Sequence, residues 1–382
     1  MPGRKVLLVN QASRALMVEI VNAYTTSGLY DEVVLACGNE IPEKFHLDSR
    51  VKLQRIAKYN TKNTLTRTWS WIRATVKLVF LCWFRYRHHE LFLVSNPPTS
   101  SFITRLCRNK YDTLIYDIYP DGLAITEFMT PNNIIYRLWA KHNKVFYKKA
   151  RYVYTITDGM AKTISKYCPS DKIEVVSLWS DPNLKVVKEP LPNNRFRMEQ
   201  GIQNKFVVMY SGNIGKGHDL TCLIDAAKML HEHKDILFYF IGEGYLKPIL
   251  QSRAKELEVE DTCVFLPYQS LDMLPYSLSS SNIAVVSTGV KGGDESIPSK
   301  VFDLIKIGKP VLCIASQNSE IARLVNKHNI GKCFNSSDVS QIAQFILSAY
   351  QNPEILSEYA KNAEICSGLY TNTLAKQFVK NK

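Results

Sequence analysis

One short stretch carries residue types that could hold a phosphate group. Residues 210–219 read YSGNIGKGHD and follow an apolar, β-branched run from Phe206 to Tyr210. The glycines of this stretch are Gly212, Gly215 and Gly217. Glycines after a buried strand let backbone N–H groups approach a phosphate, the start of the next helix adds partial positive charge, and Lys216 adds a full charge. The spacing is neither GxxxxGK[ST] nor GxGxxG, so taken alone the stretch equally fits a tight turn.

A second stretch adds acidic groups and another lysine. Residues 295–310 read ESIPSKVFDLIKIGKP, and we expect a helix from Ser299 to Ile307. Lys300 at its start could meet a phosphate, with Glu295 in the loop ahead and Asp303 one turn into the helix. One acid could then bind a sugar ring and the other a ribose. Two acids eight residues apart indicate nothing by themselves.

Together the two stretches resemble the C-terminal half of retaining GT-B glycosyltransferases of glycosyltransferase family four. The family pattern is a strand with a GNxG-like loop, a GEG turn, a "flPy" segment, and E-x7-E running into G-x-P-V. The corresponding segments here are YSGNIGKGHD (210–219), IGEG (241–244), VFLPYQ (264–269), Glu295 with Asp303, and GKPVL (308–312). The PSK at 298–300 is similar to the branch that builds bacterial surface polysaccharides. The implied fold is α/β, of the GT-B type, with two Rossmann-like domains facing across a cleft.

The resemblance implies a donor site for a nucleotide-diphosphate sugar. Lys300 would neutralise the diphosphate, Glu295 would hold sugar hydroxyls and Asp303 the ribose. The other implied donor-site residues are Gly212, Asn213, Gly215, Lys216, Gly217, Glu243, Tyr268 and Ser299. Two positions depart from the family pattern, because Asp303 stands where the family has Glu and Asn213 where many relatives have Arg.

Asp117 is the candidate for a catalytic or acceptor-orienting role in the first half of the chain. It ends a buried strand in YDIYPDGL (116–123), at the carboxyl end where open α/β sheets bind ligands. The segment is similar to the family's D-x-x-P segment, and no His occurs at this point. A carboxylate that only caps the next loop is the alternative. The predicted catalytic set is therefore Asp117, Glu295 and Lys300.

Alternating strands and helices divide the 382 residues into two domains. We predict an N-terminal domain over 1–180, a linker over 181–204 and a donor domain over 205–360. A helix in 361–382 would cross back to the first domain, as the resemblance implies. Within the first domain Ser13 would cap a helix ending near Ser27, and within the second a helix would run from His218 to His233.

The net charge of +13 and its placement favour an anionic surface as a partner. The segment Thr64–His89 is apolar, aromatic and basic at once, and its longest apolar run is far shorter than the ~20 residues of a transmembrane helix. Such a helix suits the membrane interface, although a core helix with a solvated basic face remains the alternative. Asn132–Arg151 is a second basic candidate. We expect a peripheral protein on the cytoplasmic face of the membrane, with no nucleic-acid partner and no signal peptide.

The predicted function is hexosyl transfer from a nucleotide-diphosphate sugar to a lipid-linked glycan, with retention. No cofactor or metal is expected, because D-x-D and ligand clusters are missing and lysines replace a cation. The nine cysteines are scattered and fit reduced thiols. The alternatives are a catalytically silent, membrane-associated partner subunit of a transferase and a GT-B sugar-nucleotide 2-epimerase.

Overall fold

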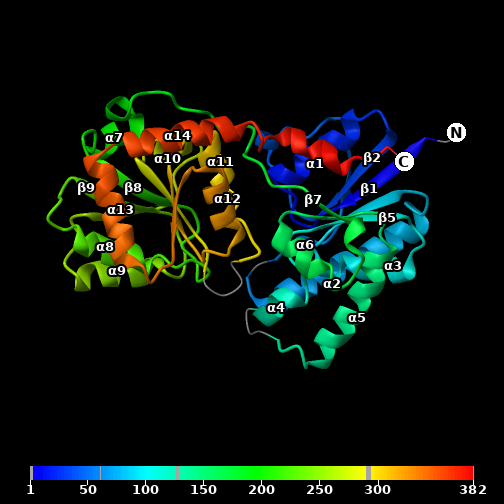
Figure 1. Ribbon diagram of the computed structural model, residues 1–382. Coiled ribbons are helices and arrows are strands. Elements are labelled where there is room, and N and C mark those ends of the chain that lie inside the picture. Colours follow the sequence, from blue (N-terminus) through cyan, green and yellow to red (C-terminus); the bar gives the residue numbers. More distant parts are fainter. Residues whose placement is uncertain (1–2, 61, 126–128, 290–293, 382) are drawn as a thin grey trace. The chain divides into compact units, whose positions relative to one another are not determined.

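The computed structural model describes residues 3–60, 62–125, 129–289 and 294–381. They fall into two compact units, which are described separately (Figure 1). Unit 1 holds residues 1–183 and 372–382, and unit 2 holds residues 184–371. The predicted α/β class is confirmed, because each unit is built on a parallel sheet with helices.

The sheet of unit 1 has the strand order β3-β2-β1-β4-β5-β6-β7, and neighbouring strands are parallel. Its central strands read as continuous apolar runs, which is typical of parallel strands covered on both faces. The strands are β1 (Arg4–Val9), β2 (Tyr30–Cys37), β3 (Lys52–Arg55), β4 (Glu90–Val94), β5 (Tyr111–Ile115), β6 (Val153–Thr155) and β7 (Ile173–Val175).

Successive residues of β1 enter two different cores, one on each face of the sheet. Leu8 packs with Tyr24 of α1 and with Phe378 of the C-terminal 3-10 helix η5. Leu7 packs on the other face with Leu78 of α2 and with residues of α5 and α6. The helices are α1 (Ala15–Thr26), α2 (Thr64–Phe84), α3 (Ile103–Leu106), α4 (Asp121–Ile125), α5 (Ile134–Lys149), α6 (Asp158–Ile164) and η5 (Asn372–Phe378).

The prediction that Ser13 caps α1 is wrong. The N-cap residue is Arg14, and the Ser13 hydroxyl donates to the carbonyl oxygen of Asn10 at 3.0 Å. The loop after β1 therefore uses this hydroxyl to hold its own shape.

Helix α2 begins at a reciprocal cap between Asn63 and Thr66. Its inner side is small and apolar, with Ala74 and Leu78 fully buried. It is the helix that the basic, aromatic segment predicted. None of the helices in the described residues has both the length and the apolar character needed to span a bilayer.

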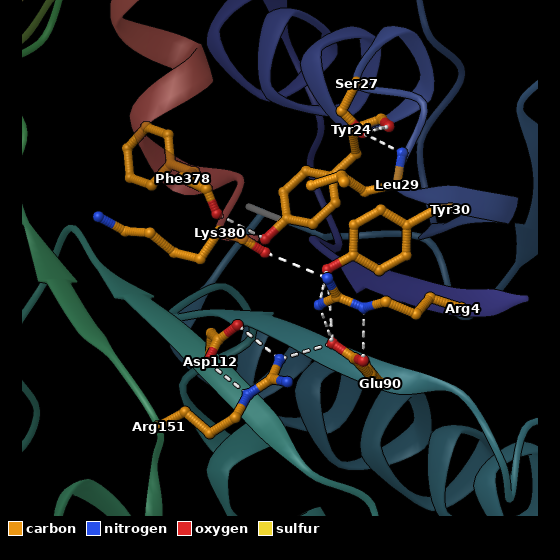
Figure 2. Close-up of polar contacts among 10 residues, drawn as sticks. All are labelled: Arg4, Tyr24, Ser27, Leu29, Tyr30, Glu90, Asp112, Arg151, Phe378 and Lys380. Carbon is orange, nitrogen blue, oxygen red and sulfur yellow. Dashed lines mark hydrogen bonds and ion pairs between the residues drawn. The ribbon is translucent and has the colours of Figure 1, made fainter. Parts of the chain in front are cut away.

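A charged network at the amino ends of β1, β4 and β5 joins the C-terminal segment to unit 1 (Figure 2). Arg4 pairs with Glu90 at 3.0 Å and donates to the carbonyl oxygen of Lys380 at 3.2 Å. Arg151 pairs with Asp112 at 2.7 Å and with Glu90 at 2.8 Å. These contacts place residues 372–382 in unit 1.

The sheet of unit 2 has the order β10-β9-β8-β11-β12-β13, again with parallel neighbours. Val208 and Tyr210 of β8 enter a core with α8, α9, α13 and α14, and Val207 and Met209 face Phe196. The strands are β8 (Phe206–Ser211), β9 (Ile236–Ile241), β10 (Cys263–Leu266), β11 (Ile283–Ser287), β12 (Val311–Ile314) and β13 (Gly331–Phe334). The helices are α7 (Arg195–Gln200), α8 (Thr221–Met229), α9 (Lys247–Glu256), α10 (Leu274–Ser279), α11 (Lys300–Lys306), α12 (Glu320–His328), α13 (Val339–Gln351) and α14 (Glu354–Ser367).

Most of the segment predicted as a linker, 181–204, is built into unit 2. It contains α7, whose Arg197 is only 2% exposed. The Arg197 guanidinium donates to the carbonyl oxygens of Ser280 at 2.8 Å and Lys205 at 2.7 Å and to Asn282 Oδ1 at 2.6 Å. A buried arginine that is bound by carbonyl oxygens does not change the hydrophobic pattern of the sequence. For this reason the sequence indicated only a polar segment.

Removing the Phe378 ring should destabilise unit 1. Phe378 packs against Phe92 and Tyr154, with ring centroids 5.9 and 5.0 Å away. We expect Phe378→Ala to lower the free energy of unfolding by roughly 3–5 kcal/mol, measured by urea denaturation. The exposed neighbour provides the control, and Gln377→Ala should stay within about 0.5 kcal/mol of the unsubstituted protein. Equal effects of the two substitutions would contradict this assignment of the C-terminal segment.

Candidate donor site

Two glycine-bearing loops of unit 2 lock together at the carboxyl ends of β8 and β9. The Ile214 N–H donates to the carbonyl oxygen of Glu243 at 2.9 Å. A Cβ on Gly242 would lie 1.9 Å from the Gly212 oxygen, and one on Gly244 would lie 2.3 Å from the Ile214 oxygen. Gly242 and Gly244 also have φ of +142° and +152°. Only glycine fits both the close approach and the dihedral angles.

The second half of the first loop is bound to the end of β11. The Gly289 N–H donates to the Gly217 oxygen at 2.7 Å, and the Asp219 N–H donates to Ser287 Oγ at 3.1 Å. His218 Nδ1 donates to the Ser287 oxygen at 2.8 Å. These bonds hold the loop away from helical geometry, so the predicted helix start at His218 is wrong and α8 begins at Thr221.

Lys300 lies at the centre of this region. Its Nζ is 3.5 Å from the centroid of the Tyr210 ring, a cation–π contact, and would be 3.5 Å from a Cβ on Gly212. Burial lowers the pKa of Lys300 to about 7. Within the described parts of the chain, its ammonium forms no ion pair with a carboxylate. The Tyr210 hydroxyl donates to the Asn213 oxygen at 2.7 Å, which ties the aromatic ring to the loop.

A pocket of about 200 Å³ opens beside Lys300. Gly212, Tyr268, Lys300 and Asp303 line its polar side, so the structure brings these four predicted residues together. Its apolar lining comes from Met209, Leu274, Leu278, Val285 and Leu304. An apolar slot with a few convergent polar groups at one end is the usual form of a small-molecule site. It could take a flat ring on the apolar side and an anion near Lys300.

Two predicted residues make contacts that the sequence did not suggest. The ammonium of Lys216 lies 4.1 Å from the centroid of the Tyr245 ring. The Glu243 carboxylate pairs with Lys247 at 2.7 Å, and the same ammonium donates to the Gly242 oxygen at 3.0 Å. Glu243 therefore holds the GEG turn in place, whatever else it binds.

The remaining predicted residues flank this region. Ser299 precedes α11, is exposed and makes no side-chain cap. Glu295 is half-buried in the segment before it. The Asn213 carboxamide lies against Gly215, where a Cβ would be 2.7 Å from Asn213 Nδ2. The donor-site residues thus all lie in unit 2, whereas Asp117 belongs to unit 1.

Asp117 follows β5 at the carboxyl edge of the unit 1 sheet. Its side chain is exposed, and its backbone N–H donates to Ser95 Oγ at 3.3 Å. Desolvation by the surrounding protein disfavours the charged carboxylate and raises the pKa of Asp117 above its ordinary value. No hydrogen bond from a loop N–H to its carboxylate occurs among the described residues, so the capping alternative gains no support.

Three residues of the site were missed by the sequence analysis. Tyr210 was assigned to the strand, and Tyr245 and Lys247 received no role. The pairing of Glu243 with Lys247 follows the i,i+4 spacing, which was a usable signal. The rings of Tyr210 and Tyr245 contact Lys300 and Lys216 only because of how the chain folds. No spacing rule predicts these contacts. In the described ranges, no group of three or more His, Cys, Asp or Glu side chains could hold a metal ion.

Comparison with known proteins bears on both units. Residues 193–365 match the family model described as Glycosyl transferases group 1. WbjE of Pseudomonas aeruginosa, named a probable glycosyltransferase, is 24% identical over 62% of this chain. WcaI of Escherichia coli K12, whose name assigns it to colanic acid biosynthesis as a glycosyl transferase, is 26% identical over 47%. The chain spans only 59% and 43% of the lengths of these two relatives.

Solved structures show the fold over nearly the whole chain. Anabaena Alr3699/HepE, solved in complex with UDP and glucose, has a TM-score of 0.72 at 14% identity and covers 98% of both chains. WaaG, described as a glycosyltransferase involved in lipopolysaccharide biosynthesis, has a TM-score of 0.70 at 13% identity and covers 99% of this chain and 100% of its own. The predicted GT-B architecture of two Rossmann-like domains is therefore confirmed, as is a glycosyltransferase at the level of the domain family. Residues 193–365 thus match the group 1 glycosyltransferase family model within a chain of the GT-B fold, and the chain is similar to a probable glycosyltransferase and to a protein named for colanic acid biosynthesis.

Proposed function

We propose that this protein transfers a sugar from a nucleoside-diphosphate donor to a lipid-linked glycan acceptor in surface-polysaccharide synthesis. The observation that carries the proposal is the apolar pocket whose polar end holds Lys300 without a carboxylate partner in the described chain. The base would occupy the apolar side and the ribose would meet Asp303. That neighbours of this fold were solved with UDP supports a nucleotide donor.

The chemistry assigned to the site is hexosyl transfer with retention, in the manner of glycosyltransferase family four. The bond from the anomeric carbon to the diphosphate breaks, and the diphosphate leaves with the electron pair. The acceptor oxygen bonds to that carbon, and its proton passes to the departing phosphate oxygen. Lys300 and loop amides among residues 213–217, other than the Ile214 N–H that binds Glu243, stabilise the charge on the leaving group, so no metal is needed. Glu295 holds sugar hydroxyls and Asp117 orients the acceptor hydroxyl.

An exposed apolar surface on α2 supports the proposal of a lipid-linked acceptor. Large apolar side chains are exposed along one face of α2 at helical spacing: Leu65, Trp69, Ile72, Val76, Phe80, Trp83 and Phe84. Trp69, Ile72, Val76, Phe80 and Phe84 of this set line an open groove of about 890 Å³. Arg73, Lys77 and Arg85 line the same groove. At the start of α5, Ile134, Ile135 and Leu138 are exposed as well. An apolar stripe with basic flanks suits an anionic bilayer interface on the cytoplasmic side.

Nucleotide binding tests the donor site first. We expect one class among UDP-, GDP-, dTDP- and CMP-sugars to raise the melting temperature, since ligand at about 100 times its Kd adds about 2.7 kcal/mol. The shift should persist in EDTA, disappear in Lys300→Ala and remain in Lys327→Ala, an exposed lysine elsewhere in unit 2. No shift with any class would favour a silent partner subunit.

Lys300 should lower the free energy of unfolding of the ligand-free protein. Its folded pKa of about 7 lies below the ordinary 10.5, so the unfolded chain binds more protons between these values. The penalty is therefore full below about pH 7 and fades as pH rises toward about 10.5. We expect Lys300→Met to raise the free energy of unfolding by about 0.5–2 kcal/mol at about pH 6.5 and by less at about pH 9.5. Lys327→Met is the control, and a gain that does not depend on pH would count against the burial of a charge.

The apolar stripe on α2 should bind anionic vesicles. Burying a Phe side chain is worth about 1.5–3 kcal/mol, so Phe84→Ser should weaken binding about tenfold or more. Co-sedimentation with phosphatidylcholine vesicles, with and without phosphatidylglycerol, measures this. Ile365→Ser, at another exposed apolar position, in unit 2, should leave binding unchanged. Equal binding to both vesicle types would remove the electrostatic part of the proposal.

A further inference from the structure

His218 directly follows the last glycine of the loop after β8, and the proposed mechanism gives it no role. Its ring Nδ1 lies 2.8 Å from the carbonyl oxygen of Ser287, and its backbone N–H donates to the Gly215 oxygen at 3.1 Å. A carbonyl oxygen only accepts hydrogen bonds, so Nδ1 must carry a proton. The hydrogen bond to Ser287 therefore fixes the tautomer of the neutral ring, and the lone pair is on Nε2.

Nε2 is the unused nitrogen of this ring. It makes no hydrogen bond with the described residues, and the atom is not buried. The backbone N–H groups of Gly215, Lys216 and Gly217, just ahead of His218, also donate to no acceptor in the described chain. Unused N–H groups in a turn form a site for an anion. The free nitrogen of a fixed imidazole thus lies at the end of a loop suited to phosphate.

His218 and Lys300 contact the same aromatic ring. The rings of His218 and Tyr210 have centroids 5.8 Å apart and meet edge to face at 60°. The ammonium of Lys300 lies 3.5 Å from the centroid of the same Tyr210 ring. Tyr210 therefore holds the histidine near the lysine that we assign to the diphosphate.

His218 is neutral in the ligand-free protein at neutral pH. Burial, and after it the charge of Lys300, lower the pKa of His218 below its ordinary 6.5, while the hydrogen bond to Ser287 raises it. Of the titratable groups described, Lys300 of α11 and Tyr210 of β8 face the ring, and Asp219 follows it in the loop. An anion beside His218 and Lys300 would favour the protonated form of both.

We propose that His218 is a further ligand of the donor diphosphate and that diphosphate binding adds a proton to its Nε2. The neutral ring offers Nε2 only as an acceptor, and a phosphate oxygen is also an acceptor. A hydrogen bond between them therefore needs one more proton, which comes from solvent, while Nδ1 keeps its bond to Ser287. The imidazolium then makes a charge-assisted hydrogen bond beside Lys300. This inference rests on the proposed function and adds a residue and a proton to its donor site.

Nitrogen NMR of the full chain labelled with 15N-histidine tests the proton on Nε2. The eight histidines are assigned with His→Asn variants, and the probes are UDP-, GDP- and dTDP-sugars and inorganic pyrophosphate. We expect the Nδ1–H tautomer and a midpoint below pH 6.5 for ligand-free His218. A bound anion should raise the midpoint to about pH 7.5 or higher, a tenfold or greater gain in proton affinity. His88, an exposed histidine of unit 1, should keep its midpoint.

His218→Asn separates binding by Nε2 from a structural role of the ring. The asparagine amide can still donate to the Ser287 oxygen, but it has no group in place of Nε2. Calorimetry in buffers of different ionisation enthalpy counts the protons taken up with the sugar nucleotide. We expect His218→Asn to reduce this uptake and to weaken binding about tenfold or more at about pH 6.5. His88→Asn should change neither quantity. Weaker binding with unchanged proton uptake would contradict the proposal.

The two kinds of probe distinguish this inference from the proposed function. A sugar nucleotide that binds without raising the His218 midpoint overturns the inference and leaves the donor site in place. Pyrophosphate that raises the midpoint, when no sugar nucleotide binds, supports the His218 anion site and rejects the transferase. No response of His218 to any of the probes, together with no binding, rejects both.

Discussion

The close approach of the Gly212 and Gly242 backbones is the constraint on which the donor site depends. A Cβ on Gly242 would lie 1.9 Å from the Gly212 oxygen, so a larger residue would force the two loops apart. The first loop also accepts a hydrogen bond from the Tyr210 hydroxyl at its Asn213 oxygen, and the Tyr210 ring lies under the ammonium of Lys300. Gly212 lines the pocket beside Lys300, so this loop forms part of the pocket wall.

Lys300 lowers the stability of the ligand-free protein and also provides a positive charge that can bind an anion. Burial lowers its pKa to about 7, so the ligand-free protein holds a lysine that is expensive to charge. An anion at the same place would offset that cost and favour the protonated form. The ligand-free site is therefore destabilising. A bound diphosphate would remove that cost, which would strengthen its binding.

Helix α2 has two faces of different character, one exposed and one buried. Its outer face exposes Trp69, Phe80 and Phe84, its inner side is buried, and Trp71 packs against Tyr119. If the outer face rests on a bilayer, as proposed, this helix would hold unit 1 at the membrane surface.

The sequence by itself determined the α/β class, because strand–helix alternation is a local signal. The GT-B architecture and the set Gly212, Tyr268, Lys300 and Asp303 followed from the resemblance of several ordered motifs to a known family, since no single spacing indicates them. Only the tertiary structure decided the partners of these residues. Lys216 lies over Tyr245, α8 begins three residues late, and the stretch expected as a linker holds the buried Arg197. These contacts join residues far apart in the chain or depend on carbonyl groups, and neither leaves a periodic trace in the sequence.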